Sequence, residues 1–148
     1  MTLAVWLVVL YSGALLAVVD IAARRLPTPV IAAAATAVIA ILATEAAITA
    51  DGRRLANAAA AGAAVGSGYL LLALIAGSLG LGDVRLAALL GAALGTLGWD
   101  AVLVGAVLPY MFAAPAALIR LVSRPGEGSM SFGPYLVAGA LAALLITV

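Results

Sequence analysis

Six long apolar runs, separated by short polar segments, take up most of this chain. They are Leu3–Val19, Val30–Ala50, Leu55–Leu79, Val84–Leu97, Ala101–Val122 and Phe132–Val148. Each holds about 14–25 residues, close to the ~20 that an α-helix needs to cross the hydrocarbon of a bilayer. Because backbone amides find no partner in lipid, each run has to form a helix. We therefore predict an all-α, polytopic membrane protein in which residues 1–148 form a single bundle of six transmembrane helices.

Charged residues are few, and two residue types with reactive side chains are missing altogether. Charged residues make up 9% of the chain, the net charge is +1, and there is no cysteine and no histidine. This composition excludes thiolate nucleophiles, metal sites built from Cys and His, and imidazole bases. Proton chemistry near neutral pH therefore falls to carboxylates, tyrosines or water. We expect neither a cofactor nor a metal ion, and no surface for nucleic acid.

The arginines indicate how the helices are oriented. If successive helices alternate in direction, one side of the membrane receives Arg53 and Arg54, and the other side receives five arginines. The five are Arg24, Arg25, Arg85, Arg120 and Arg124. Since cytoplasmic loops carry the excess of basic residues, we predict that the side with five arginines is cytoplasmic and that the N-terminus lies outside. Trp6 and Trp99 would then both lie at the outer interface, as in an aromatic belt.

The same alternation places two aspartates, Asp20 and Asp83, together on the cytoplasmic side, although they lie at the ends of different runs. Each has a simple structural explanation. Asp83 could cap the N-terminus of the fourth helix by accepting backbone N–H bonds. Asp20 could be the water-facing end of the first helix, balanced by Arg24 four positions later.

The other carboxylates receive only structural explanations. We expect Asp51 and Asp100 to lie at helix ends on the outer side, and Glu45 to lie at the outer interface without an obvious partner. Glu127 belongs to the polar segment 123–129, which we predict to be a flexible cytoplasmic loop. A metal-dependent mechanism is therefore not expected.

A second explanation for Asp20 and Asp83 is that they act together. Both lie beside breaks in the backbone, because Gly80 and Gly82 precede Asp83 and Pro27 follows Asp20. Two carboxylates that approach closely cannot both ionise easily, so one keeps a proton while the other stays charged. Such a pair supplies a general base that activates water and a general acid that polarises a carbonyl.

Two small-xxx-small patterns suggest how the helices pack. Gly62–Gly66 and Gly91–Gly95 each place glycines four positions apart within an apolar run. Small residues at this spacing let helix backbones approach closely in lipid. Because a chain rich in alanine and glycine also produces such patterns by chance, packing and coincidence are both open for each.

Three segments together resemble type IV prepilin peptidases, a family of membrane aspartic proteases with a GxGD motif. Gly80–Leu86, which reads Gly-Leu-Gly-Asp-Val-Arg-Leu, resembles the family signature Gly-x-Gly-Asp-x-Lys. Asp20–Pro27 resembles the family's first aspartate with its basic stretch and proline. Met130–Leu136 resembles the C-terminal Pro-Phe-Gly-Pro-Phe-Leu segment of the family. The resemblance extends over nearly the whole chain, with the three segments in the family's order and on the expected membrane face.

Three positions depart from the family pattern. Arg85 stands where the family has lysine, Ser131 replaces the first proline of the C-terminal segment, and Tyr135 replaces its second aromatic residue. Arg85 keeps the positive charge, and the positive-inside rule alone is enough to explain it.

The resemblance implies an aspartic endopeptidase of the bacterial inner membrane that removes the basic leader from pilin-like precursors at the cytoplasmic face. It assigns catalysis to Asp20 and Asp83. Motif, substrate-contact or structural roles fall to Gly80, Gly82, Arg85, Phe132, Gly133 and Pro134. Its partners would be the precursor, membrane lipid and the pilus or secretion machinery. Without cysteines, or room before the first run for the methyltransferase domain of many members, we expect peptidase activity alone, as in the short forms.

Other functions are compatible with edge carboxylates. A small transporter or ion-coupled channel is the main alternative, since intramembrane carboxylates often mark ion or proton paths. That function predicts polar residues near the middle of the runs, whereas the candidates here lie at their edges. A structural membrane subunit without chemistry, and a GxGD protease acting on other substrates, are further alternatives.

Overall fold

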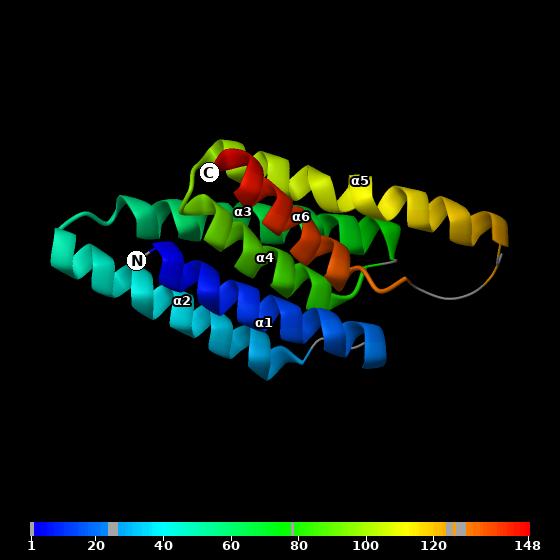
Figure 1. The fold of residues 1–148 in the computed structure, drawn as a ribbon, viewed down its shortest axis with the longest axis horizontal. Helices are drawn as coiled ribbons and strands as arrows, with labels where there is room; N and C mark the ends of the chain where they lie inside the picture. Colours follow the sequence, from blue (N-terminus) through cyan, green and yellow to red (C-terminus); the bar gives the residue numbers. More distant parts are fainter. Residues whose placement is uncertain (1, 24–26, 78, 124–125, 127–129) are drawn as a thin grey trace.

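The computed structural model describes residues 2–23, 27–77, 79–123, 126 and 130–148, and these residues form six α-helices (Figure 1). The helices are α1 (Thr2–Ala23), α2 (Thr28–Thr49), α3 (Arg53–Ala76), α4 (Leu81–Gly95), α5 (Trp99–Ser123) and α6 (Gly133–Thr147). Each of the predicted apolar runs corresponds to one helix. The prediction of an all-α chain with six helices is therefore confirmed for the described residues.

The six helices differ in their ability to span a membrane. In the described part of the chain, α1, α2, α3 and α5 are long and apolar enough to cross a bilayer. These four helices indicate a multi-pass membrane protein. The other two, α4 and α6, have 15 residues each and are therefore about 22 Å long.

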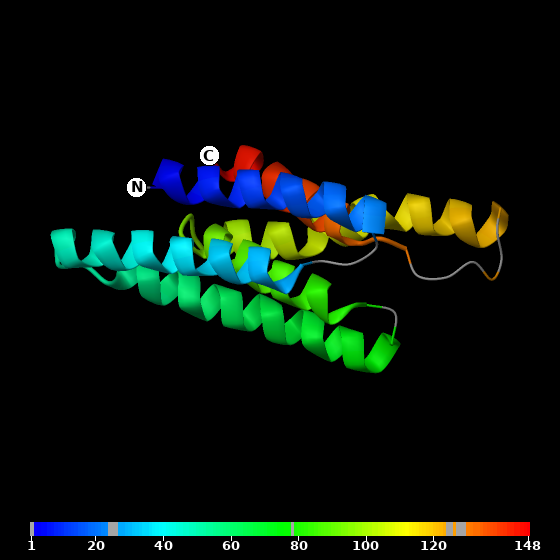
Figure 2. The same ribbon diagram turned by 90° about the horizontal axis from the view of Figure 1, so that it is seen from below.

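Successive helices run in opposite directions, so one end of the bundle gathers segments that are distant in sequence. The C-terminal ends of α1, α3 and α5 point to the right of Figure 1 and Figure 2, and α2, α4 and α6 begin on that side, α2 nearer the middle; both chain termini lie toward the other end. Arg85 and Arg120 belong to the right-hand end, and Arg53 and Arg54 to the opposite one. Arg24, Arg25, Arg124 and Glu127 lie outside the described residues.

The two glycine patterns face one another across α3 and α4. A Cβ atom built on Gly91 would lie 2.7 Å from the Cβ of Val65, and one on Gly66 would lie 2.9 Å from the Cβ of Ala88. A Cβ on Gly95 would lie 2.6 Å from the Cβ of Ala61, whereas Gly62 has slightly more room, at 3.1 Å from the Cβ of Ala92. Since distances under 3.0 Å are too short for carbon atoms, the close approach of α3 and α4 requires glycine. The patterns therefore form a packing interface, as the first of the two explanations predicted.

The position of Trp6 contradicts the predicted aromatic belt. Its side chain is only 4% exposed and belongs to the core, whereas Trp99 is 49% exposed. The reason is helical geometry, because Trp6 shares a face of α1 with Val9 and Leu16, and both of these are buried in the bundle.

The carboxylates at the end of the bundle opposite Asp20 are engaged locally. Glu45, for which no partner was expected, forms an ion pair with Arg54 at 2.8 Å across the α2–α3 turn. Asp51 Oδ1 accepts a hydrogen bond from the backbone N–H of Arg53 at 3.0 Å, at the start of α3. Asp100 lies in the first turn of α5. The predicted helix-end positions of the two aspartates are therefore confirmed.

Candidate active site

Asp20 lies in the last turn of α1, and its side chain is buried rather than water-facing. It is 5% exposed. Its Oδ2 atom accepts a hydrogen bond from the backbone N–H of Gly133 at 3.1 Å and another from the Ser131 hydroxyl. The water-facing explanation for Asp20 is therefore wrong, because the segment that begins α6 covers the carboxylate. Arg24, the partner expected in that explanation, lies outside the described residues.

The start of α6 is built to receive a carboxylate. Gly133 is the first residue of α6, so its N–H belongs to the group of amides that the helix itself leaves free. The positive end of the helix dipole also points toward Asp20. A side chain at position 133 would put Cβ 2.7 Å from Asp20 Oδ2, so only glycine allows this approach. Pro134, the next residue, suits the first turn of a helix because it has no N–H to satisfy.

Asp83 lies in the first turn of α4, just before the apolar run 84–97. Its Oδ2 accepts a hydrogen bond from the N–H of Gly80 at 3.3 Å, and its own N–H donates to the Gly80 carbonyl oxygen at 3.0 Å. This reciprocal pair shows that Asp83 does cap the helix, as the structural explanation predicted. Gly82 lies between them in the same turn.

The two aspartates interact electrostatically. Burial, followed by the negative charge of Asp20, raises the pKa of Asp83 from 3.8 to about 6, against the opposing effect of the Gly80 N–H. Asp20 therefore lies near enough to Asp83 to oppose its ionisation, although helix α1 carries one and helix α4 the other. A pKa of about 6 leaves part of the Asp83 population protonated in mildly acidic to neutral solution, so this carboxyl group can act as an acid there.

Four aromatic rings gather beside this pair. The ring centroid of Phe132 lies 5.4 Å from that of Tyr110, 6.4 Å from that of Tyr69 and 6.3 Å from that of Tyr135. Tyr69 and Tyr110 are 5.5 Å apart, and the Tyr69 hydroxyl donates to the carbonyl oxygen of Ala106 at 3.2 Å. The rings come from α3, α5, α6 and Phe132, the residue just before α6. The resemblance singled out Phe132 and Gly133. Neighbouring rings hold Phe132 in place, and the hydrogen bond to Asp20 holds Gly133.

Sequence reasoning did not single out Tyr69 or Tyr110. The chain has only four tyrosines, and a hydroxyl inside an apolar run needs a polar partner when it is buried. That scarcity is the signal that could have drawn attention to them.

Arg85 does not join the carboxylates. Its guanidinium donates to the hydroxyl of Thr28 at 2.8 Å, at the start of α2, and it forms no ion pair with a carboxylate among the described residues. Of the predicted site residues, the structure thus joins Asp20 to Gly133 and places it in electrostatic contact with Asp83. The Arg85 side chain instead reaches Thr28 at the start of α2.

A cavity of about 500 Å³ opens beside Asp20. It is lined by Ile21, Ala116, Ile119, Arg120, Met130, Ser131, Pro134 and Tyr135. Ser131 both lines the cavity and donates a hydrogen bond to Asp20, so this one side chain lies between the cavity and the carboxylate. A chain segment bound there would meet mainly apolar side chains.

Within the described part of the chain, no three acidic, histidine or cysteine side chains gather in a way that could hold a metal ion. Comparison of this chain with known protein families, curated proteins and solved structures finds no match.

Proposed function

We propose that this protein is an aspartic endopeptidase of the bacterial inner membrane, in which Asp20 and Asp83 form the catalytic pair. The observation that carries the proposal is the environment of the Asp20 side chain. Its carboxylate is buried, held by the N–H of Gly133 and the hydroxyl of Ser131, and in electrostatic contact with Asp83. A buried carboxylate at a helix end is costly unless it is paired or used, and the half-buried Asp83 is influenced by its charge.

The proposed reaction divides the work between the two carboxyl groups. Ionised Asp20 takes a proton from a water molecule, whose oxygen attacks the carbonyl carbon of the scissile peptide bond. Protonated Asp83 gives its proton to the carbonyl oxygen as the tetrahedral intermediate forms. The intermediate then collapses: one of its hydroxyl groups returns a proton to Asp83 as the carbonyl re-forms, the C–N bond breaks, and the proton taken up by Asp20 passes to the departing amine. No covalent enzyme intermediate forms.

The proposed substrate is the precursor of a type IV pilin-like protein, in keeping with the resemblance of the three motifs. All six helices cross the membrane in this proposal, with the N-terminus outside and the pair at the cytoplasmic face. Side chains of the precursor's apolar segment enter the cavity lined by Ser131 in this proposal, and its basic leader stays in the cytoplasm. Substrate, lipid and pilus or secretion machinery are the partners. No methyltransferase activity is proposed.

The decisive experiment is co-expression with candidate pilin precursors, scoring leader removal by the change in precursor mass. We expect wild-type protein to cleave a precursor, and Asp20→Asn and Asp83→Asn each to abolish cleavage while still inserting into the membrane. Asp100→Asn, at the opposite end of the bundle, is the matched control and should retain activity. A fully active Asp83→Asn protein would end the proposal.

A further inference from the structure

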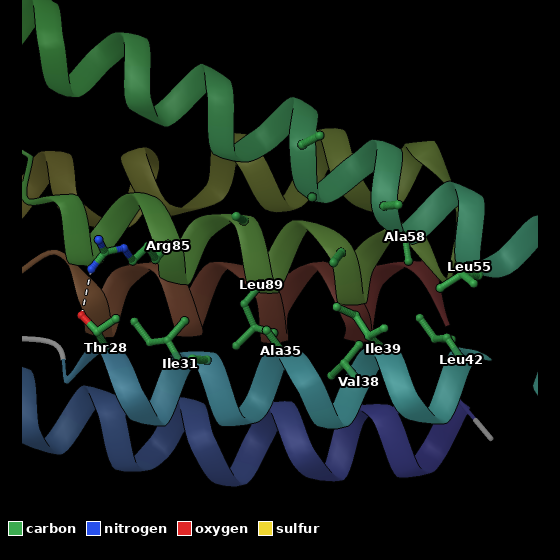
Figure 3. Close-up of a pocket in the computed structure, with 16 residues that line it drawn as sticks. Thr28, Ile31, Ala35, Val38, Ile39, Leu42, Leu55, Ala58, Arg85 and Leu89 are labelled. Carbon is green, nitrogen blue, oxygen red and sulfur yellow. Dashed lines mark hydrogen bonds between the residues drawn. The ribbon is translucent and has the colours of Figure 1, made fainter. Parts of the chain in front are cut away.

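A second cavity, of about 480 Å³, lies between α2, α3 and α4 (Figure 3). Its walls are small or branched apolar side chains, such as those of Ile31, Ala58 and Leu89. The polar side chains in its lining are those of Thr28 and Arg85, and both lie at the same end of the cavity (Figure 3). This distribution describes a long apolar groove with a single cationic mouth.

The dimensions of the groove decide what can fill it. Its lining residues on α2 run from Thr28 to Leu42, which is about 21 Å along a helix. A volume of 480 Å³ spread over that length makes the groove long and narrow, about 8 Å wide once the radius of a water molecule is added along each wall. A helix with its side chains is about 10–12 Å wide, so it does not fit. A single hydrocarbon chain, about 4 Å thick from carbon to carbon contact, does fit.

The mouth of the groove has the chemistry of a phosphate site. The guanidinium of Arg85 is exposed, donates one hydrogen bond to the Thr28 hydroxyl, and pairs with no carboxylate among the described residues. Arginine presents several donors in a planar fork that matches phosphate oxygens. This end of the bundle is also the one that we propose to be cytoplasmic, where anionic lipids concentrate.

We propose that this groove binds one acyl chain of an anionic phospholipid, whose phosphate contacts Arg85 and Thr28. The site would be separate from the aspartate pair. It would fill the space between α2 and the closely packed α3 and α4 with lipid rather than with protein, and the bound lipid would join α2 to the rest of the bundle.

The proposal is tested by native mass spectrometry of the purified protein in detergent, with phosphatidylglycerol or phosphatidylcholine of identical acyl chains. We expect wild-type protein to retain phosphatidylglycerol preferentially. Arg85→Gln should weaken its retention about fivefold, the value of one basic residue at an anionic headgroup. Ala32→Leu, which fills the groove, should weaken retention of both lipids. Ala33→Leu and Arg53→Gln are matched controls outside the groove and should behave as wild type.

Two results would overturn the proposal. One is equal retention of the two lipids by wild-type protein, with no effect of Arg85→Gln or Ala32→Leu. The other comes from a photo-crosslinking amino acid placed at Ala35, inside the groove. In native membranes it should label phospholipid, and labelling of a protein segment instead would mean that a polypeptide fills the groove.

Discussion

Replacing Gly133 by alanine tests the contact on which the proposed active site rests. The new Cβ would lie 2.7 Å from Asp20 Oδ2 and 3.2 Å from its Cγ. To reach an ordinary contact of 3.4 Å, the start of α6 and the carboxylate have to separate by about 0.7 Å. The hydrogen bond from the Gly133 N–H, now 3.1 Å long, would then be lost.

The expected effects can be sized from this displacement. A misplacement of about 1 Å in a catalytic group costs on the order of 100-fold in rate, so a shift of about 0.7 Å should slow leader cleavage between about 10-fold and 100-fold. Loss of a hydrogen bond to a charged group should lower the free energy of unfolding by about 1.5–3 kcal/mol. Ser131 still donates to Asp20, so we expect the protein to fold. Cleavage is measured with a co-expressed precursor, and stability by thermal unfolding in detergent.

The control is Gly68→Ala, which also replaces a glycine by alanine in a helix. A Cβ at position 68 meets nothing within 4 Å, so this variant should cleave normally and gain up to about 1 kcal/mol in stability. If Gly133→Ala cleaves and unfolds as wild type does, the contact between Gly133 and Asp20 supports neither cleavage nor stability, and the reasoning is refuted. Loss of cleavage that simply follows loss of folded protein would refute it as well.

Three further outcomes are expected. Burial and Asp20 raise the pKa of Asp83 from 3.8 to about 6, so between these pH values the folded protein holds a proton that the unfolded chain has lost. The melting temperature of wild type relative to Asp83→Asn should therefore fall as pH rises from about 4 through 6, and stay level above. Gly91→Ala inserts a Cβ 2.7 Å from a side chain of α3, and should lower the free energy of unfolding by about 1–3 kcal/mol in the same melts, against a gain for Gly68→Ala. Glu45→Gln breaks the ion pair with half-exposed Arg54, and should cost less than about 1 kcal/mol and leave cleavage unchanged.

The helices could be predicted from the sequence because solvation dictates them. An apolar run that must satisfy its own amides becomes a helix wherever it is placed, so the predicted Val30–Ala50 appears as Thr28–Thr49. The starts shift by two or three residues where polar side chains join the first turn. Asp83 does so by capping α4, which consequently begins at Leu81 rather than at Val84.

The surroundings of the candidate site could be predicted only in part. Alternating helix directions were enough to place Asp20 and Asp83 at one end of the bundle, but no local pattern says which groups touch Asp20. Its two donors, Ser131 and Gly133, lie more than a hundred positions away and reach it through tertiary packing. The burial of Trp6 was missed for the same reason, since an orientation relative to the membrane does not say which side of a helix faces the bundle.

The unequal lengths of the helices have a consequence for the bilayer. Helix α5 has 25 residues and is about 37 Å long, and it extends past the other helices at the right of Figure 1, whereas α4 and α6 are about 22 Å long. If α4 and α6 also cross the membrane, as we propose, hydrocarbon about 30 Å thick has to thin beside these short helices and to thicken, or be crossed at a tilt, beside α5. The first turns of α4 and α6 carry Asp83 and Gly133. The thinned bilayer at those turns would bring bulk water down to the carboxylates, while α5 keeps lipid around an incoming helix.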